Sequence, residues 1–143
     1  MTLALPAEGG CTCGQVRYRL TGEPVFLTIC HCTECQRQSG SAFGMSMRMR
    51  REDVTVTRGE LKSWTRIADN GNAVGLAFCA NCGTRIWHEP AEPGFVHIKP
   101  GTLDDTSQLR PRYQSYTVRQ HDWVKLDGIE MSFETMPAKR GQV

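Results

Sequence analysis

The sequence predicts a mainly β fold with at most short helices. Three observations lead to this prediction. Apolar and polar residues alternate in several short runs, turn signals separate those runs, and a single stretch carries helix signals. With 143 residues, 39% of them hydrophobic and 22% charged, the chain has the size and composition of one ordinary soluble domain. We therefore expect a single domain over residues 1–143.

The clearest strand pattern covers residues 15–20, where Val16, Tyr18 and Leu20 would share one buried face. Residues 43–50 alternate in the same way and place three methionines on one face, opposite two arginines. Arginines on a strand usually face water, so we expect this second face to be solvated. We expect the core to include Met45, Met47, Met49, Trp64, Trp87 and Trp123.

The other predicted strands cover residues 24–29, 54–57, 61–67, 73–79, 84–88, 95–99 and 114–118. A strong turn signal, Asp-Asn-Gly-Asn, at residues 69–72 would join two of them as a hairpin. One or two helical turns are predicted at residues 33–39, ended by Gly40. Residues 1–9 and 137–143 are expected to be loose.

Seven cysteines fall into three clusters, with the spacings CxC, CxCxxC and CxxC. The first residues show neither a basic stretch nor a long apolar run, so we read no signal peptide and expect a cytoplasmic protein. Clustered cysteines in a reducing compartment bind metal or carry out chemistry. No apolar run approaches the roughly 20 residues that span a bilayer, which argues against a membrane protein.

The formal charge of +2 counts every cysteine as a neutral thiol. Metal-bound cysteines are thiolates, and seven thiolates with two Zn²⁺ ions would bring the charge to −1. A nearly neutral protein lacks the overall positive field that attracts phosphate backbones. We therefore expect no nucleic-acid partner.

Glycines separate the clusters into two kinds. Cys13 and Cys82 are each followed by glycine, whereas Cys35 is not. In a metal knuckle the backbone turns tightly after the second cysteine, so that amides can point at sulfur, and glycine permits that turn. We assign one closed, structural zinc site to Cys11, Cys13, Cys79 and Cys82. Isolated CxxC pairs can also be redox dithiols or inert buried cysteines.

The remaining cluster, Cys30, Cys32 and Cys35, offers three thiolates and no eighth cysteine to complete a shell. Three protein ligands and an open position are typical of a catalytic or ligand-accepting zinc, and an outside thiol is a natural fourth ligand. Three other interpretations stay open. The cluster could be metal-free with a disulfide, it could fill only with substrate, or a histidine could close the shell. The candidates for that last role are His31, His88, His97 and His121.

Three segments of the chain carry a resemblance to a known family: GGCTCGQVRY, CHCTECQRQSGSAF and FCANCGTRIW. Together they resemble the glutathione-dependent formaldehyde-activating enzyme family, which includes centromere protein V-like domains. The resemblance runs from residue 9 to about residue 123, which we take as the core of the domain. It implies an Mss4-like, tent-like arrangement of antiparallel sheets around a structural zinc. It places that zinc on Cys11, Cys13, Cys79 and Cys82.

For the middle cluster the resemblance implies a catalytic or labile zinc near which glutathione binds. The implied reaction is the condensation of formaldehyde with glutathione to S-hydroxymethylglutathione, classed as carbon–sulfur lyase chemistry. Such an enzyme would act on a small thiol and an aldehyde. The alternative function is a non-catalytic zinc module that binds a thiol or a protein partner. The sequence predicts no oligomeric state.

Three polar residues follow the middle cluster and would border a ligand there. Arg37 could pair with a glutathione carboxylate, although a solvated helix arginine is an equally good interpretation. Ser39 and Ser41 could donate hydrogen bonds to an anion, or they could simply end the helix. We predict these three as ligand-binding residues.

Overall fold

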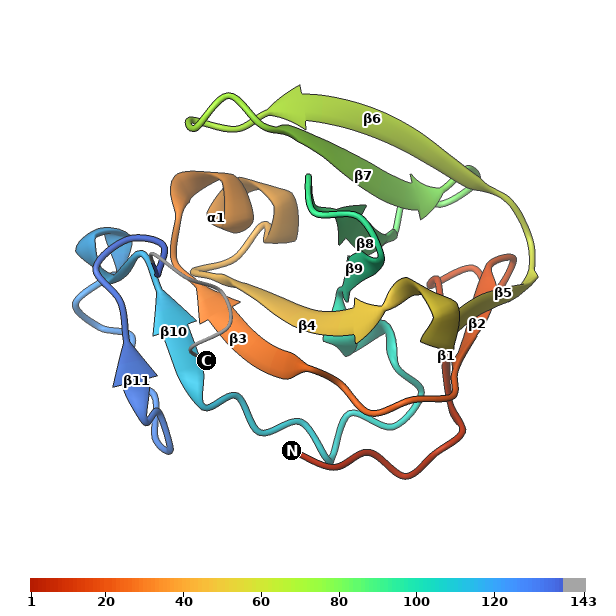
Figure 1. The fold of residues 1–143 in the computed structure, drawn as a ribbon, viewed down its shortest axis with the longest axis horizontal. Helices are drawn as coiled ribbons and strands as arrows, with labels where there is room; N and C mark the ends of the chain where they lie inside the picture. Colours follow the sequence, from red (N-terminus) through yellow and green to blue (C-terminus); the bar gives the residue numbers. More distant parts are fainter. Residues whose placement is uncertain (138–143) are drawn as a thin grey trace.

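The computed structural model describes residues 1–137, so the predicted loose C-terminal segment lies, apart from Pro137, outside the described residues. Within that range the chain forms strands in two sheets and one α-helix (Figure 1). The strands are β1 Ala7–Gly10, β2 Arg17–Leu20, β3 Phe26–Cys30, β4 Gly44–Arg50, β5 Val54–Arg58, β6 Leu61–Ile67, β7 Ala73–Cys79, β8 Arg85–Glu89, β9 Phe95–Ile98, β10 Tyr113–Ser115 and β11 Met131–Ser132. The helix α1 spans Thr33–Ser39, and 3-10 turns cover Arg51–Asp53, Pro100–Thr102 and Thr117–Arg119. The mainly β prediction is confirmed.

The smaller sheet has the order β1-β2-β5, with both pairs antiparallel. The larger sheet has the order β11-β10-β3-β4-β9-β8-β7-β6. Its long β6–β7 hairpin reaches over α1 in Figure 1. Most strand pairs are antiparallel, as expected, and β10 alone pairs in parallel within the described residues, with both β3 and β11. Parallel neighbours require a long crossover between them, and a local pattern does not reveal it.

Two of the predicted boundaries are wrong. Residues 7–10 form a paired strand, β1, and not a loose end, because they align with β2 from Ala7 opposite Leu20 to Gly10 opposite Arg17. The predicted strand at residues 114–118 begins at Tyr113 and stops at Ser115. A 3-10 turn follows it. The strand β11 was not predicted.

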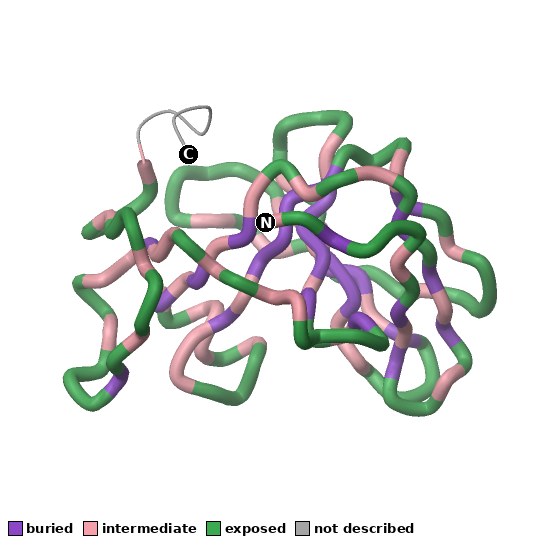
Figure 2. The backbone as a smooth tube through the Cα atoms, turned by 90° about the horizontal axis from the view of Figure 1, so that it is seen from below, coloured by how far each residue is buried: buried purple, intermediate pink, exposed green. Residues whose placement is uncertain are grey.

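The core lies between the two sheets, where buried residues concentrate on the central strands (Figure 2). The predicted face of β2 is confirmed, since Val16, Tyr18 and Leu20 are fully buried. Met47 and Met49 of β4 are equally buried and belong to the same cluster. Complete burial of one such side chain contributes roughly 1.5–3 kcal/mol to the stability of the fold.

Three expectations about large side chains are wrong. Trp64 is 62% exposed and Trp123 is 74% exposed, so only Trp87 belongs to the core among the tryptophans. Arg48 does not face water: it is 4% exposed, with its guanidinium 3.8 Å from the centre of the Phe95 ring. Its charge is neutralised by Glu92 at 2.5 Å. The pair explains why an arginine can lie inside a strand that is covered on both faces.

No helix within residues 1–137 is long and apolar enough to cross a bilayer.

Candidate metal centres and the adjoining cavity

Four cysteine sulfurs from two distant knuckles meet at one point. Cys11, Cys13, Cys79 and Cys82 have sulfurs that all lie within 4.8 Å of one another. The sulfur of Cys13 is 3.5 Å from that of Cys11 and 3.8 Å from that of Cys79. Sulfurs bound at about 2.3 Å to one tetrahedral ion lie about 3.8 Å apart, so this spacing fits a four-thiolate metal site.

Both knuckles have the backbone geometry that the glycine pattern predicts. Gly14 and Gly83 have φ values of 77° and 79°, a conformation that a side chain makes costly. The amide of Gly14 donates to the Cys11 carbonyl at 3.1 Å, and that of Gly83 to the Cys79 carbonyl at 3.0 Å. These turns bring each cysteine pair into position for a shared ion.

Backbone amides point at the sulfurs, as thiolate ligands require. The amide of Val16 donates to the Cys11 sulfur at 3.2 Å, and the amides of Asn81 and Cys82 donate to the Cys79 sulfur at 3.4 and 3.5 Å. Hydrogen bonds from the hydroxyl and backbone of Thr84 lower the pKa of the Cys82 thiol to about 5. The environment of Cys82 therefore favours ionised sulfur at neutral pH, which is the form that binds metal.

The second cluster lies where β3 runs into α1. Cys30 is the last residue of β3, Cys32 is the N-cap of α1, and Cys35 lies in its first turn. Their three sulfurs also lie within 4.8 Å of one another. The amide of Cys35 donates to the Cys32 sulfur at 3.3 Å. Hydrogen bonds from the Cys30 and Cys35 thiols lower the pKa of the Cys32 thiol.

No histidine joins this cluster. Among residues 1–137, the groups of side chains that could share a metal ion contain cysteines alone. His31 is fully buried, and its Nε2 lies 2.9 Å from the Gln114 side-chain oxygen. His121 stacks on Trp123 and contacts Gln36 instead. All seven cysteines are free thiols, so the disulfide alternative is also absent from this structure.

The three-thiol cluster opens into a cavity of about 980 Å³, large enough for a ligand of several tens of atoms. The walls come from α1, the tip of the β6–β7 hairpin, the strands β8 and β9, and residues 113–119. Its polar lining includes Arg66, His88, His97, Tyr116 and Arg119. None of the four thiols of the other cluster lines this cavity. The two clusters therefore differ in access as well as in ligand number.

Basic side chains surround the three thiols. The Nε of Arg66, on the cavity wall, is buried without a hydrogen-bond partner among residues 1–137, and so are two nitrogens of Arg85. Burial lowers the pKa of Arg85 and of Lys99, although the nearby Cys35 sulfur acts on both in the opposite direction. Arg119 is anchored by a 2.8 Å bond to the Thr33 hydroxyl at the start of α1. Unpartnered buried cations beside a cavity favour an anionic ligand.

The three predicted ligand-binding residues lie elsewhere. Arg37, Ser39 and Ser41 are exposed, and none of them lines the cavity. The Ser39 hydroxyl donates to the Phe43 carbonyl at 2.8 Å, which closes the end of α1. The cavity borders the face of the helix that carries Cys35 and Gln38, whereas Arg37 and Ser39 lie off that face and Ser41 follows the helix. A ligand-binding role for these three residues stays a prediction.

The residues that do line the cavity were missed because they come from distant parts of the chain. Nothing near Arg66 or Arg119 in the sequence marks them as ligand-binding residues, and His88 was considered only as a possible metal ligand. One signal was present: Arg66 is three residues before the Asp-Asn-Gly-Asn turn, so a hairpin bent over the cysteines would carry it there.

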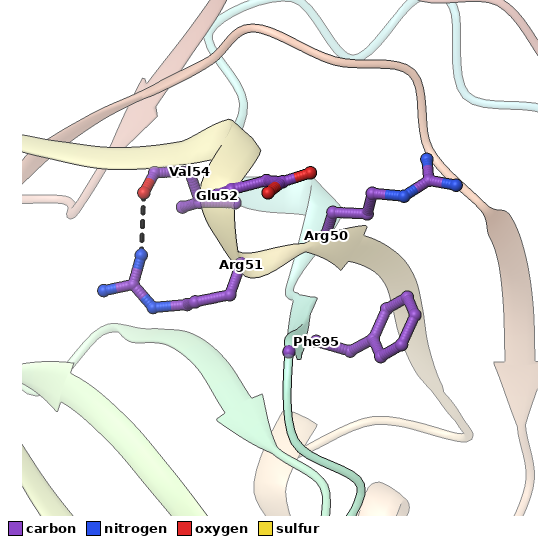
Figure 3. Close-up of a pocket in the computed structure, with 6 residues that line it drawn as sticks. Arg50, Arg51, Glu52, Val54 and Phe95 are labelled. Carbon is purple, nitrogen blue, oxygen red and sulfur yellow. Dashed lines mark hydrogen bonds between the residues drawn. The ribbon is translucent and has the colours of Figure 1, made fainter.

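A second, shallow hollow of about 690 Å³ lies at the end of β4 (Figure 3). Its lining contains no cysteine. Arg51 bends back to donate to the Val54 carbonyl at 2.7 Å, and Arg50 points away from the other labelled side chains in Figure 3. The side chains do not converge on a ligand position, so this hollow is not the candidate site.

The fold and the two cysteine clusters define a mainly β protein that could hold two metal ions. The family model of the glutathione-dependent formaldehyde-activating enzyme matches residues 6–119, and the chain belongs to this family. A curated protein of Halomonas elongata, provisionally named as a glutathione-dependent formaldehyde-activating enzyme, is 25% identical over 129 residues. That alignment covers 86% of this chain and 82% of the relative.

The fold is also similar to a crystal structure of a Rhodobacter sphaeroides protein, with a TM-score of 0.57 and 20% identity. The similarity covers 88% of this chain and 98% of that one. At this identity the comparison supports the fold alone.

Proposed function

We propose that this protein is a zinc-dependent enzyme of the carbon–sulfur lyase type that acts on the adduct of a thiol with an aldehyde, such as S-hydroxymethylglutathione. The observation that carries the proposal is the difference between the clusters. Three thiols face a large cavity while four others form a closed group outside it. Family membership supports glutathione and formaldehyde as the substrates.

The two sites would have different tasks. Cys11, Cys13, Cys79 and Cys82 would hold a structural Zn²⁺ that ties the N-terminal knuckle to the end of β7. Cys30, Cys32 and Cys35 would hold a second Zn²⁺ with one position left toward the cavity. When bound there, this ion supplies a Lewis acid that keeps a coordinated thiol ionised at neutral pH.

The chain itself orients the three thiols. The amide of His31, between Cys30 and Cys32, donates to the Ser115 carbonyl at 3.0 Å. The Gln36 side chain donates to the His31 carbonyl at 2.8 Å and to the Arg119 carbonyl at 3.2 Å. These bonds fix the Cys-His-Cys segment against β10 and the turn after it, so the sulfurs keep one arrangement as ligands enter and leave.

The cations of the cavity would bind and position the thiol substrate. Glutathione carries two carboxylates, and an arginine can hold a carboxylate through two parallel hydrogen bonds. Arg66 and Arg119 are placed for this on opposite walls, one on the β6–β7 hairpin and the other beside the start of α1. Free thiols and thiolate ligands fit a reducing compartment, so we also propose a cytoplasmic location.

An exchange experiment tests the function. Glutathione and ¹³C-formaldehyde form their adduct without an enzyme, so the quantity to measure is the rate of interconversion at equilibrium, by NMR exchange spectroscopy. The zinc-loaded protein should raise this rate in proportion to its concentration, and Cys32→Ser should not. A rate equal to that of buffer with either protein would contradict the proposal and would favour the non-catalytic zinc module.

A further inference from the structure

Tyr116 has the most unusual backbone in the wall of the cavity. Its φ is 54° and its ψ is 43°, and it is the one residue other than glycine with a positive φ among residues 1–137. A side chain in this left-handed region costs roughly 1–2 kcal/mol. Strained positions of this kind occur mostly at functional sites, where the surroundings enforce them.

The strand register places this residue beside the three thiols. Ser115 of β10 pairs directly with Cys30 of β3, and Tyr116 is the next residue. Its amide donates to the Thr135 carbonyl at 3.4 Å, and its carbonyl accepts from the Arg119 amide at 2.9 Å. The backbone is thus held on both sides, and the side chain lines the cavity.

The phenol has no hydrogen-bonding task within the described chain. Tyr18, by contrast, shares a 2.8 Å hydrogen bond between its hydroxyl and that of Thr102 and belongs to the core. No residue among 1–137 makes a hydrogen bond with the Tyr116 hydroxyl. Burial is the main factor that raises the pKa of Tyr116. The hydroxyl therefore stays protonated and available as a donor at neutral pH.

We propose that Tyr116 is a catalytic residue that donates its hydroxyl proton to the aldehyde oxygen during thiol addition. This inference rests on the proposed function. The thiolate sulfur attacks the carbonyl carbon, a carbon–sulfur bond forms, and the carbon–oxygen π bond breaks. The oxygen takes the proton of Tyr116. The resulting phenolate is reprotonated from the water that received the proton lost by the thiol. The net reaction joins one thiol and one aldehyde, and adduct breakdown follows the same steps in reverse.

Tyr116→Phe removes the proton donor and little else. A matched control is Tyr113→Phe, since Tyr113 lines the same cavity but pairs with Thr28, two residues from Cys30 along β3. A positioned general acid contributes roughly 10²–10⁴-fold. We expect Tyr116→Phe to lower kcat for adduct exchange at least about tenfold, with KM and zinc content within about twofold of the parent. Tyr113→Phe should stay within about twofold in kcat.

A second readout separates proton donation from packing. The rate with Tyr116→Phe should rise with the concentration of a small buffer acid, which replaces the missing donor, while the parent rate should not. If the parent accelerates exchange and Tyr116→Phe retains more than half of its rate, the role of Tyr116 is wrong and the proposed function stands. The role is equally wrong if both variants lose activity together, if zinc is lost, or if the buffer acid has no effect. If the parent itself does not accelerate exchange, both proposals fall.

Discussion

At the scale of single residues, substitution of one cysteine from each cluster distinguishes the two sites. Cys82 belongs to the closed group and follows β7, whereas Cys32 caps α1 and lines the cavity. Serine is close to cysteine in size but is a far weaker zinc ligand, so each substitution removes one ligand with little change in volume. The loss of stability then depends on which segments of the chain the bound ion connects.

We predict that Cys82→Ser loses the zinc of the closed site and most of the stability, because that ion joins segments 66 residues apart, as Cys13 and Cys79 are. Cys32→Ser should lose one zinc per chain and any exchange activity, and should keep its fold. Metal analysis and thermal unfolding of the two variants, side by side, measure both effects. Equal destabilisation by the two changes would show that the sites do not differ in function.

His88 provides a test of pH dependence. It lies in the cavity wall against His97, with the two ring centres 4.6 Å apart. Burial, reinforced by the positive charges of Lys99, His97, Arg85 and Arg66, lowers its pKa well below 6.5. As the pH falls below 6.5 the unfolded chain binds a proton that the folded chain does not, so this contribution to stability is present above pH 6.5 and is lost at lower pH.

We predict that the parent loses about 1.4 kcal/mol of unfolding free energy from this source between pH 7.5 and pH 5.5. His88→Gln should not show that part of the loss. Urea unfolding of the zinc-loaded proteins at both pH values gives the difference. The same loss in parent and variant would mean that His88 is able to take up a proton in the folded state.

The sequence predicted the two groups of cysteines well and the cavity residues poorly, for a physical reason. Metal knuckles are local, since both cysteines and the glycine of each turn lie within five residues. The cavity instead collects Arg66, His88, Tyr116 and Arg119 from three separate segments. Arg37, Ser39 and Ser41 were chosen for their nearness along the chain. The helix carries them away from the cavity.

At the scale of elements, alternation identified the strands with buried faces and missed those without one. The strand β2 follows its predicted alternation, because one of its faces must leave water. The strand β7 was predicted from the turn that precedes it, and its buried residues do not alternate. The strand β1 contains two glycines and forms through its pairing with β2, so its sequence gives little local signal. The two-residue β11 depends in the same way on its neighbour β10.

The knuckle after β7 can be tested as an element. Gly83 has a φ of 79° and open space where a Cβ would be, so alanine there meets only the backbone cost. We predict that Gly83→Ala lowers the free energy of unfolding by roughly 1–2 kcal/mol and weakens zinc retention. The control is Gly101→Ala, which also meets open space but without a positive φ, and which should change stability by less than about 0.5 kcal/mol. Indistinguishable variants would show that the turn does not need glycine.

At the scale of the whole molecule, the larger sheet brings the three-thiol cluster and the walls of the cavity together. Its central strands β3 and β4 carry the cluster and the core, while β10 on one side and the β6–β7 hairpin on the other supply opposite walls of the cavity (Figure 1). The closed cysteine site lies at the other end of β7, where it joins β1 and β2 to the larger sheet. One ion would therefore support the architecture and the other would serve the cavity.

The most direct test of this account is the release of zinc to a chromogenic chelator, with circular dichroism recorded on the same sample. We predict two zinc ions per chain, one released rapidly while the spectrum stays unchanged, and one released only as the protein unfolds in urea. Added glutathione should slow the rapid phase, because a thiol would complete the three-cysteine shell. Release of both ions in a single phase, or loss of the fold with the first ion, would contradict the division into a closed site and an open one.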